Sequence, residues 1–170
     1  MRHDLVVLGD DGVGKTELVN QFLGPYVEDF DPILEDTSGQ KYVVVDGQPC
    51  VMHLIDFTGN NLKEYMALCE MYIRTGDGFV IVYSVTNRSS FEQVLEHYMQ
   101  AMRMDNLKWP RAAPAIGNKS EETALREVSF EEGQTLAWEL GCQFIETSAR
   151  DLVNVKETFR DLVRAIRQTS

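Results

Sequence analysis

The sequence predicts an α/β fold with a mostly parallel sheet, because apolar runs of strand length alternate with longer segments of helical periodicity. Its length of 170 residues matches one compact domain with one hydrophobic core. A glycine-rich stretch follows the first apolar run, and an Asp-Gly dipeptide separates two later runs. Together these observations indicate a single domain whose sheet has one antiparallel edge.

The first elements are expected between residues 5 and 55. Leu5–Leu8 has the composition of a buried strand, and Glu17–Leu23 that of a helix. Lys41–Val45 and Cys50–Ile55 predict a β-hairpin, because the Asp46-Gly47 pair supplies the positive φ angles of a tight turn.

The middle of the chain predicts two buried strands and the helix between them. Gly78–Tyr83 is expected to be one strand, and Ala112–Ile116 contributes to the other. Pro114 is unusual there, because a proline inside an internal strand removes a ladder donor and suggests a bulge. Apolar residues of the intervening helix recur on one face and are expected in the core: Phe91, Val94, Leu95, Tyr98, Met99 and Met102.

The C-terminal third predicts two more helices around a short strand. Ser129 and Glu132 form a capping box for a helix that reaches Leu140, and Gly141 is placed to end it. A short strand to Ile145 follows. The last helix has a clear apolar face: Val155, Phe159, Leu162, Val163 and Ile166.

Two long loops, Gly24–Gln40 and Asp56–Lys63, are expected to be functional, since long loops in a compact domain usually are.

Composition excludes several classes of protein. The formal net charge of −11 repels phosphate backbones and anionic membrane surfaces, so a nucleic-acid binder is not expected. Apolar runs such as Phe79–Tyr83 have about five residues, far fewer than the roughly 20 that span a bilayer. The first residues do not form a secretory signal. The three cysteines are widely spaced and lack a C-x-x-C pair, as expected of a reduced intracellular protein.

The segment Gly9–Thr16 matches the phosphate-loop pattern G-x-x-x-x-G-K-[ST] between a predicted strand and a predicted helix. Its glycines let the backbone approach closely, so that successive N–H groups and the helix N-terminus point at an anion. Lys15 adds a positive charge near the β- and γ-phosphates, and the Thr16 hydroxyl can reach Mg²⁺. The motif therefore predicts nucleotide binding.

Three further motifs follow predicted strands and extend this hypothesis. Asp56-Phe57-Thr58-Gly59 offers a carboxylate for Mg²⁺ and a glycine N–H for the γ-phosphate. Asn118-Lys119-Ser120-Glu121 and Glu146-Thr147-Ser148-Ala149 come later in the chain. With these motifs the sequence resembles the Ras family of small GTP-binding proteins from Leu5 to Gln168.

The resemblance implies a P-loop NTPase fold, the small G domain, over residues 1–170. Six strands, one of them antiparallel, would be flanked by five helices. It also implies a GTPase switch that binds GTP or GDP with Mg²⁺ and signals to effectors.

The same resemblance implies roles for individual residues. The phosphates would lie against Gly12, Val13, Gly14, Lys15 and Thr16, and Mg²⁺ against Thr16 and Asp56. Lys15, Gly59 and Asn60 would be catalytic. The guanine nucleoside would be bound by Tyr26, Asn118, Lys119, Glu121, Ser148, Ala149 and Arg150.

Several positions depart from the family pattern where hydrolysis is controlled. Ile33 replaces a threonine that ligates Mg²⁺ and contacts the γ-phosphate, at a cost of about 1–3 kcal/mol in loop coupling. Asn60 replaces the glutamine that orients the attacking water, and a displacement near 1 Å costs about 10²-fold in rate. Asp11 stands where the family has glycine and would obstruct an arginine finger, while Thr58 crowds the γ-phosphate. Slow hydrolysis is therefore expected.

Glu121 replaces the aspartate that gives the family its guanine selectivity. The extra methylene would loosen the guanine contacts by about 1–3 kcal/mol unless the loop shifts. Guanine is still expected, because Asn118, Lys119 and Ser148-Ala149 are retained.

The resemblance also implies protein partners. Effectors would bind the acidic Phe30–Gln40 loop and the adjacent Lys41–Val45 strand, which can accept an added strand. An exchange factor and a GTPase-activating protein are implied as well. The expected location is cytoplasmic, with membrane attachment only through a lipidated tail that this chain does not contain.

Two other functions compete with the switch. A Ras-like scaffold, or pseudoGTPase, would keep one nucleotide or none and act through protein contacts; Ile33, Asn60 and Asp11 favour it. A P-loop kinase is opposed by the Asn118-Lys119 element. The three histidines, His3, His53 and His97, are scattered and indicate ordinary structural or surface positions.

Overall fold

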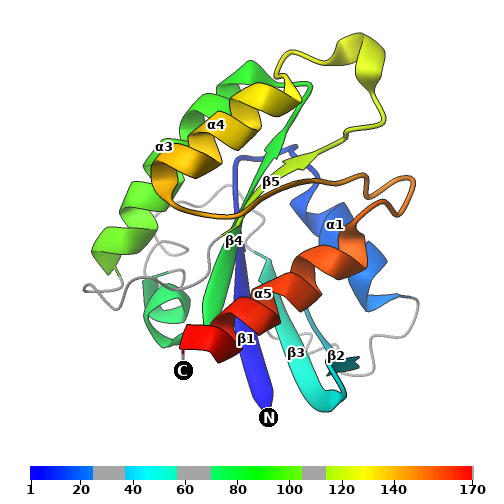
Figure 1. Cartoon of the computed structure of the whole chain (residues 1–170), viewed down its shortest axis with the longest axis vertical. Coiled ribbons are helices and arrows are strands. Elements are labelled where there is room, and N and C mark those ends of the chain that lie inside the picture. The colour runs from blue at the N-terminus through cyan, green and yellow to red at the C-terminus, as the bar shows by residue number, and fades with distance from the viewer. Residues whose placement is uncertain (25–36, 57–69, 105–113, 170) are drawn as a thin grey trace.

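The computed structural model describes residues 1–24, 37–56, 70–104 and 114–169. Six strands form one sheet in the order β2-β3-β1-β4-β5-β6, and β2 alone among them runs antiparallel to its neighbour (Figure 1). The strands are β1 (Arg2–Leu8), β2 (Thr37–Val45), β3 (Gln48–Asp56), β4 (Gly78–Ser84), β5 (Ala115–Asn118) and β6 (Phe144–Glu146).

Helices cover both faces of this sheet. They are α1 (Lys15–Leu23), α3 (Arg88–Met104), α4 (Phe130–Leu140) and α5 (Val155–Thr169), with a short 3₁₀ segment η1 (Thr123–Leu125). Residues 70–75 are helical too, so the described chain contains residues of five α-helices. The predicted α/β class, with six strands and one antiparallel edge, is confirmed.

Two hydrophobic clusters lie on opposite faces of the sheet, with α1 and α5 on one and α3 and α4 on the other. The central strand β1 contributes to both, because successive side chains of a strand point to opposite faces. Leu5 and Val7 belong to the cluster under α1 and α5, whereas Val6 and Leu8 belong to the other.

The predicted hairpin is confirmed, including its turn. Asp46 and Gly47 both have positive φ, 51° and 76°, between β2 and β3. The boundary of the preceding loop was wrong in its last four residues, because the ladder from Thr37 opposite Asp56 to Gln40 opposite His53 already belongs to the sheet. Gly39 has weak strand propensity, and the pairing with β3 overrides it.

The expectation for Pro114 was also wrong. Pro114 precedes β5, and its carbonyl accepts from the Ile81 N–H at 3.1 Å. The first donor of the strand, the Ala115 N–H, bonds the Gln143 carbonyl at 2.9 Å. No donor inside β5 is therefore lost, and the described strand needs no bulge.

Helix α3 has a wider apolar stripe than the sheet can cover. Val94 and Tyr98 are buried, but Leu95 and Met99 are 45% and 42% exposed, which corrects their assignment to the core. Phe91 and Met102 are partly buried at the edge of the cluster.

The other helix predictions are confirmed. Ser129 and Glu132 form a reciprocal capping box at α4, with bonds of 3.2 and 2.9 Å, and Gly141 ends this helix in the left-handed conformation. The predicted apolar face of α5 is buried: Val155, Phe159, Leu162, Val163 and Ile166.

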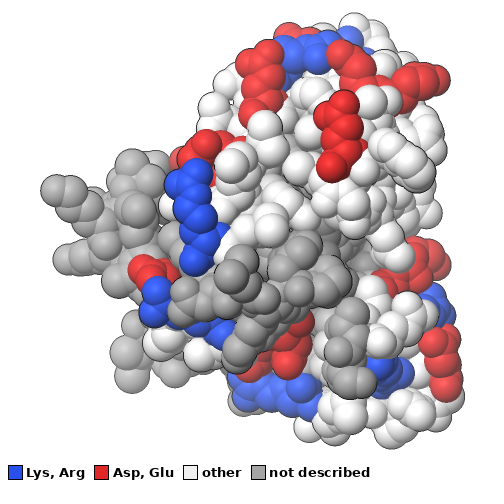
Figure 2. Space-filling view, turned by 60° about the vertical axis from the view of Figure 1, so that its left-hand side comes forward, with Lys and Arg blue, Asp and Glu red and all other residues white. Residues whose placement is uncertain are grey.

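Charged side chains of both signs lie on the face drawn in Figure 2. Among the residues coloured there, lysines and arginines are interspersed with acidic side chains and form no continuous basic patch. The surface of this face is therefore mixed in charge although the chain has a net charge of −11.

Candidate nucleotide-binding site

The motif residues gather at one edge of the sheet. Strands β1, β3, β5 and β6 are connected through parallel pairings, so their carboxyl ends lie at the same edge. The Gly9–Thr16 loop follows β1, and Asp56, Asn118 and Thr147 stand at or just after the ends of the other three. Such an edge is the usual ligand site of a doubly wound α/β sheet.

The phosphate loop has the backbone of an anion cradle. Gly12 and Gly14 adopt positive φ angles of 80° and 92° before α1 begins at Lys15. A Cβ at Gly14 would lie 2.4 Å from Asn118 Nδ2, whereas a Cβ at Gly12 would meet no atom of the described residues within 4 Å. Gly14 therefore allows close packing against the end of β5.

Lys15 reaches back across this loop. Its Nζ donates to the Gly9 carbonyl at 2.6 Å and to the Asp10 carbonyl at 2.8 Å. Burial lowers the pKa of this ammonium, and the carboxylates of Asp56, Asp11 and Asp10 partly oppose the shift. The side chain is thus fixed at the start of a helix, where the helix dipole adds to its attraction for an anion.

Two oxygen-bearing side chains meet beside the lysine. The Thr16 hydroxyl donates to Asp56 Oδ2 at 2.6 Å, although the two residues are 40 positions apart. Asp56 is completely buried. No group of three or more His, Cys, Asp and Glu within the described ranges could hold a metal by itself. This sparse oxygen set fits Mg²⁺, which proteins typically bind through one or two carboxylates together with substrate phosphates.

Asn118 links the segment that follows β6 to the phosphate loop. Its Nδ2 donates to the Val13 carbonyl at 3.0 Å. Its Oδ1 accepts from the Thr147 hydroxyl at 3.0 Å and from the Ala149 N–H at 3.3 Å. One buried side chain therefore holds three segments in register.

The residues after Asn118 present a cation and an acceptor. Lys119 has a positive φ of 62°, and its Nζ donates to the Gly12 carbonyl at 2.9 Å. Glu121 Oε2 is buried and has no hydrogen-bond partner among the described residues. A buried carboxylate oxygen without a donor is costly, so this atom fits a ligand that brings N–H groups, as guanine does.

The loop after β6 is ordered by its own hydrogen bonds. Ser148 and Val153 exchange backbone bonds of 3.1 and 3.0 Å, and Ser148 Oγ accepts from the Asp151 N–H at 2.9 Å. Ala149 is buried next to Asn118, whereas the Arg150 side chain is 72% exposed. The structure thus brings Ser148 and Ala149 into the loop beside Asn118, while Arg150 extends into solvent.

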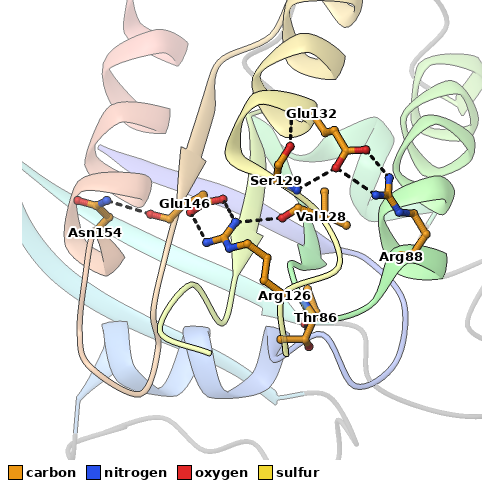
Figure 3. A network of polar contacts seen from close by, with 9 residues as sticks. Thr86, Arg88, Arg126, Val128, Ser129, Glu132, Glu146 and Asn154 are labelled. Atoms are coloured by element: carbon orange, nitrogen blue, oxygen red, sulfur yellow. Dashed lines mark hydrogen bonds and ion pairs between the residues drawn. The ribbon is translucent and has the colours of Figure 1, made fainter. Parts of the chain in front are cut away.

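A polar network stabilises the two ends of the loop between β6 and α5 (Figure 3). Arg126 binds Glu146 through two bonds of 2.7 and 2.9 Å, and Asn154 Nδ2 donates to the Glu146 carbonyl at 2.9 Å. A second pair, Arg88 and Glu132, ties α3 to the start of α4. These two ion pairs were missed from the sequence, because no local pattern marks partners that are 20 and 44 positions apart.

The contact that His97 makes with the phosphate loop was also missed, because the sequence indicated only an ordinary structural or surface position. The His97 Nε2 lies 2.8 Å from Asp10 Oδ1, so α3 contacts the phosphate loop. Asp11, the residue after Asp10, is exposed.

Other predicted site residues lie outside the described residues: Tyr26, Ile33, Thr58, Gly59 and Asn60.

A strand, a glycine loop with a buried lysine, a helix and a neighbouring carboxylate–hydroxyl pair define a P-loop nucleotide-binding protein. The model of a family described as the Ras family matches residues 4–168. Ras-like protein 1 of Pyricularia oryzae is 43% identical, over 98% of this chain and 75% of that protein. Ras-like protein B of Aspergillus fumigatus is 42% identical, over 98% of this chain and 78% of its own length.

Protein ras-2 of Neurospora crassa is 42% identical, over 98% of this chain and 80% of that protein. The chain therefore belongs to the Ras family. Members of this family bind GTP and GDP with Mg²⁺, hydrolyse GTP, and interact with effectors, exchange factors and activating proteins. Within the described part of the chain, no helix combines the length and apolarity needed to cross a bilayer.

Proposed function

We propose that residues 1–170 form one G domain that acts as a guanine-nucleotide switch with slow GTP hydrolysis. The observation that carries this proposal is the convergence of Lys15, the Thr16–Asp56 pair and the Asn118–Ala149 contact at one edge of the sheet.

In this proposal the phosphate loop holds the β- and γ-phosphates. The N–H groups of residues 12–16 surround the anion, and Lys15 neutralises part of its charge. Thr16 and Asp56 would hold Mg²⁺, which supplies further neutralisation of the phosphate oxygens when bound.

Guanine recognition is assigned to the base-side loops. Asn118 and the Ala149 N–H would read the carbonyl edge, Lys119 would pack along the base, and Glu121 would accept from N1 and N2. Tyr26, Ser148 and Arg150 would complete the surroundings of the nucleoside. The buried oxygen of Glu121 supports this assignment, because it needs donors that the described protein residues do not provide.

Slow hydrolysis is proposed from the residues beside the γ-phosphate. The exposed Asp11 carboxylate would oppose the negative charge that develops on the transferring phosphoryl group. Asn60 would position the attacking water poorly, and Gly59 would contact the γ-phosphate. Ile33 offers no oxygen to Mg²⁺, which weakens coupling between the nucleotide and the Phe30–Gln40 loop.

Effectors are proposed to bind the Phe30–Gln40 loop and β2. Among the described strands, β2 pairs only with β3 and lies at the end of the sheet, so its other edge can accept an added strand. Tyr42 and Val44 are 84% and 58% exposed on it. Exchange factors and activating proteins would act on the same nucleotide site.

The alternative is a pseudoGTPase scaffold that signals through protein contacts alone. Two adjacent carboxylates, Asp10 and Asp11, on a phosphate-binding loop favour this alternative, because they repel the nucleotide. The buried Lys15 and the Thr16–Asp56 pair argue that phosphate binding is retained.

The first experiment is to purify the protein without added nucleotide, denature it, and identify the released nucleotide by ion-exchange chromatography. Stoichiometric GTP is expected if binding is retained and hydrolysis is slow. Stoichiometric GDP would contradict slow hydrolysis. Protein that is empty and takes up no Mg²⁺-GTP would favour the scaffold. Lys15→Met serves as the matched variant and should release no nucleotide.

A further inference from the structure

Helix α3 contacts the phosphate loop through the side chains of His97 and Asp10. His97 Nε2 and Asp10 Oδ1 are 2.8 Å apart, although the two residues are 87 positions apart in sequence. Because an ionised carboxylate only accepts hydrogen bonds, the imidazole is the donor. The side chains are 26% and 33% exposed, so the contact is partly shielded from solvent.

The charges around this contact make it significant for an anion site. Asp10 and Asp11 place two carboxylates on a loop that must bind phosphates, and like charges at such short range oppose binding. Lys15 is hydrogen bonded to the Asp10 carbonyl, not to its carboxylate. The α3 residues one turn from His97 are uncharged: Gln93, Val94, Gln100 and Ala101. Within the described residues, His97 is therefore the charge-bearing group that meets the Asp10 side chain.

We propose that His97 is a positioning residue for the nucleotide site, which holds the Asp10 carboxylate against α3 and neutralises it in the imidazolium form. This inference rests on the proposed nucleotide binding. Histidine is the side chain whose charge ordinarily changes near neutral pH. Loss of the proton leaves the negative charge of Asp10 uncompensated beside the phosphates, so nucleotide release becomes faster as the pH rises.

The test is the release rate of a fluorescent GDP analogue, chased with excess GDP at fixed Mg²⁺ and low ionic strength, between about pH 5.5 and 8.5. His97→Gln is expected to release the analogue about two- to fivefold faster than wild type at the acidic end, and equally fast at the alkaline end. Asp10→Asn should release it no faster than acidic wild type. The double variant should behave like Asp10→Asn, because without the carboxylate there is no charge for His97 to neutralise.

The terminal phosphate of the nucleotide also titrates near pH 6. The quantity compared is therefore the difference between the pH profiles of wild type and His97→Gln. His53→Gln is the control, since His53 contacts Asp4 at 2.9 Å on β1 and should keep the wild-type profile. A His97→Gln profile identical to wild type would overturn the inference. So would an acceleration that is equal at every pH and persists in the double variant, because that indicates a purely structural contact. Wild type that takes up no GDP would refute the proposed function, and the inference with it.

Discussion

The side-chain amide of Asn118 donates to the carbonyl of Val13 at 3.0 Å, across 105 positions of sequence. This bond joins the last residue of β5 to the loop that follows β1. The same side chain also accepts from Thr147 and Ala149, so one buried residue joins the phosphate loop to the segment that follows β6.

Replacing Asn118 by alanine is expected to weaken both folding and nucleotide binding. The change leaves the Val13 carbonyl and the Thr147 hydroxyl without a partner, at a cost of about 2–3 kcal/mol in the free energy of unfolding. Urea unfolding measures this loss. Gln134→Ala, at an exposed position of α4, is the control and should stay within about 0.5 kcal/mol of wild type. Equal stability of the two variants would contradict the linking role of Asn118.

The hydroxyl of Tyr83 offers a test of buried polarity. This side chain is fully buried, its oxygen makes no hydrogen bond among the described residues, and burial raises the pKa of the phenol. Tyr83→Phe is expected to leave stability unchanged or raise it by about 1 kcal/mol. The matched change Tyr98→Phe should instead cost about 1 kcal/mol, because the Tyr98 hydroxyl donates to the Leu140 carbonyl at 3.0 Å. Thermal unfolding of both variants measures whether each substitution stabilises or destabilises the protein.

Glu132 makes stability depend on pH in the acid range. Its bonds to Arg88 and Ser129 lower the pKa of the carboxyl to about 2, from an ordinary value of 4.5. A depressed folded-state pKa contributes stability above pH 4.5 that is lost as the pH falls through about 2. In the Glu132→Gln variant the melting temperature should therefore depend less on pH over this interval. Glu139→Gln, exposed on the same helix, should keep the wild-type slope.

Asp11→Gly is expected to accelerate single-turnover GTP hydrolysis by about tenfold, because it removes a negative charge and a side chain beside the γ-phosphate. Phosphate release from preloaded protein measures the rate. Asp161→Asn on α5 should leave it unchanged. An unaltered rate in Asp11→Gly would show that another position limits hydrolysis.

Glu121→Ala is expected to raise the GDP dissociation constant by about tenfold or more, since guanine loses a charged acceptor. Glu122→Ala, the next residue along the chain, provides the control. Competition with a labelled nucleotide gives both dissociation constants. Equal values for the two variants would contradict the proposed role of Glu121 in guanine binding.

Local patterns predicted the fold well. The capping box at Ser129, the left-handed turn at Asp46-Gly47 and the buried face of α5 each depend on neighbours within a few residues. The phosphate loop was predictable for the same reason, because its glycines, lysine and threonine are contiguous.

Contacts between distant segments were not predictable. The Arg126–Glu146 and His97–Asp10 pairs join residues that only the folded sheet brings together. The exposure of Leu95 likewise depends on how wide a stripe of α3 the sheet covers, and that width is set by tertiary packing.

Strand β1 also determines how the molecule unfolds. Its alternate side chains enter both hydrophobic clusters, with Val7 on one face of the sheet and Val6 on the other. If either layer of helices separates from the sheet, it exposes one face of β1. The other layer packs on the opposite face of the same strand, so it loses support as well. Heating should therefore melt both layers in a single cooperative transition, with equal calorimetric and van't Hoff enthalpies.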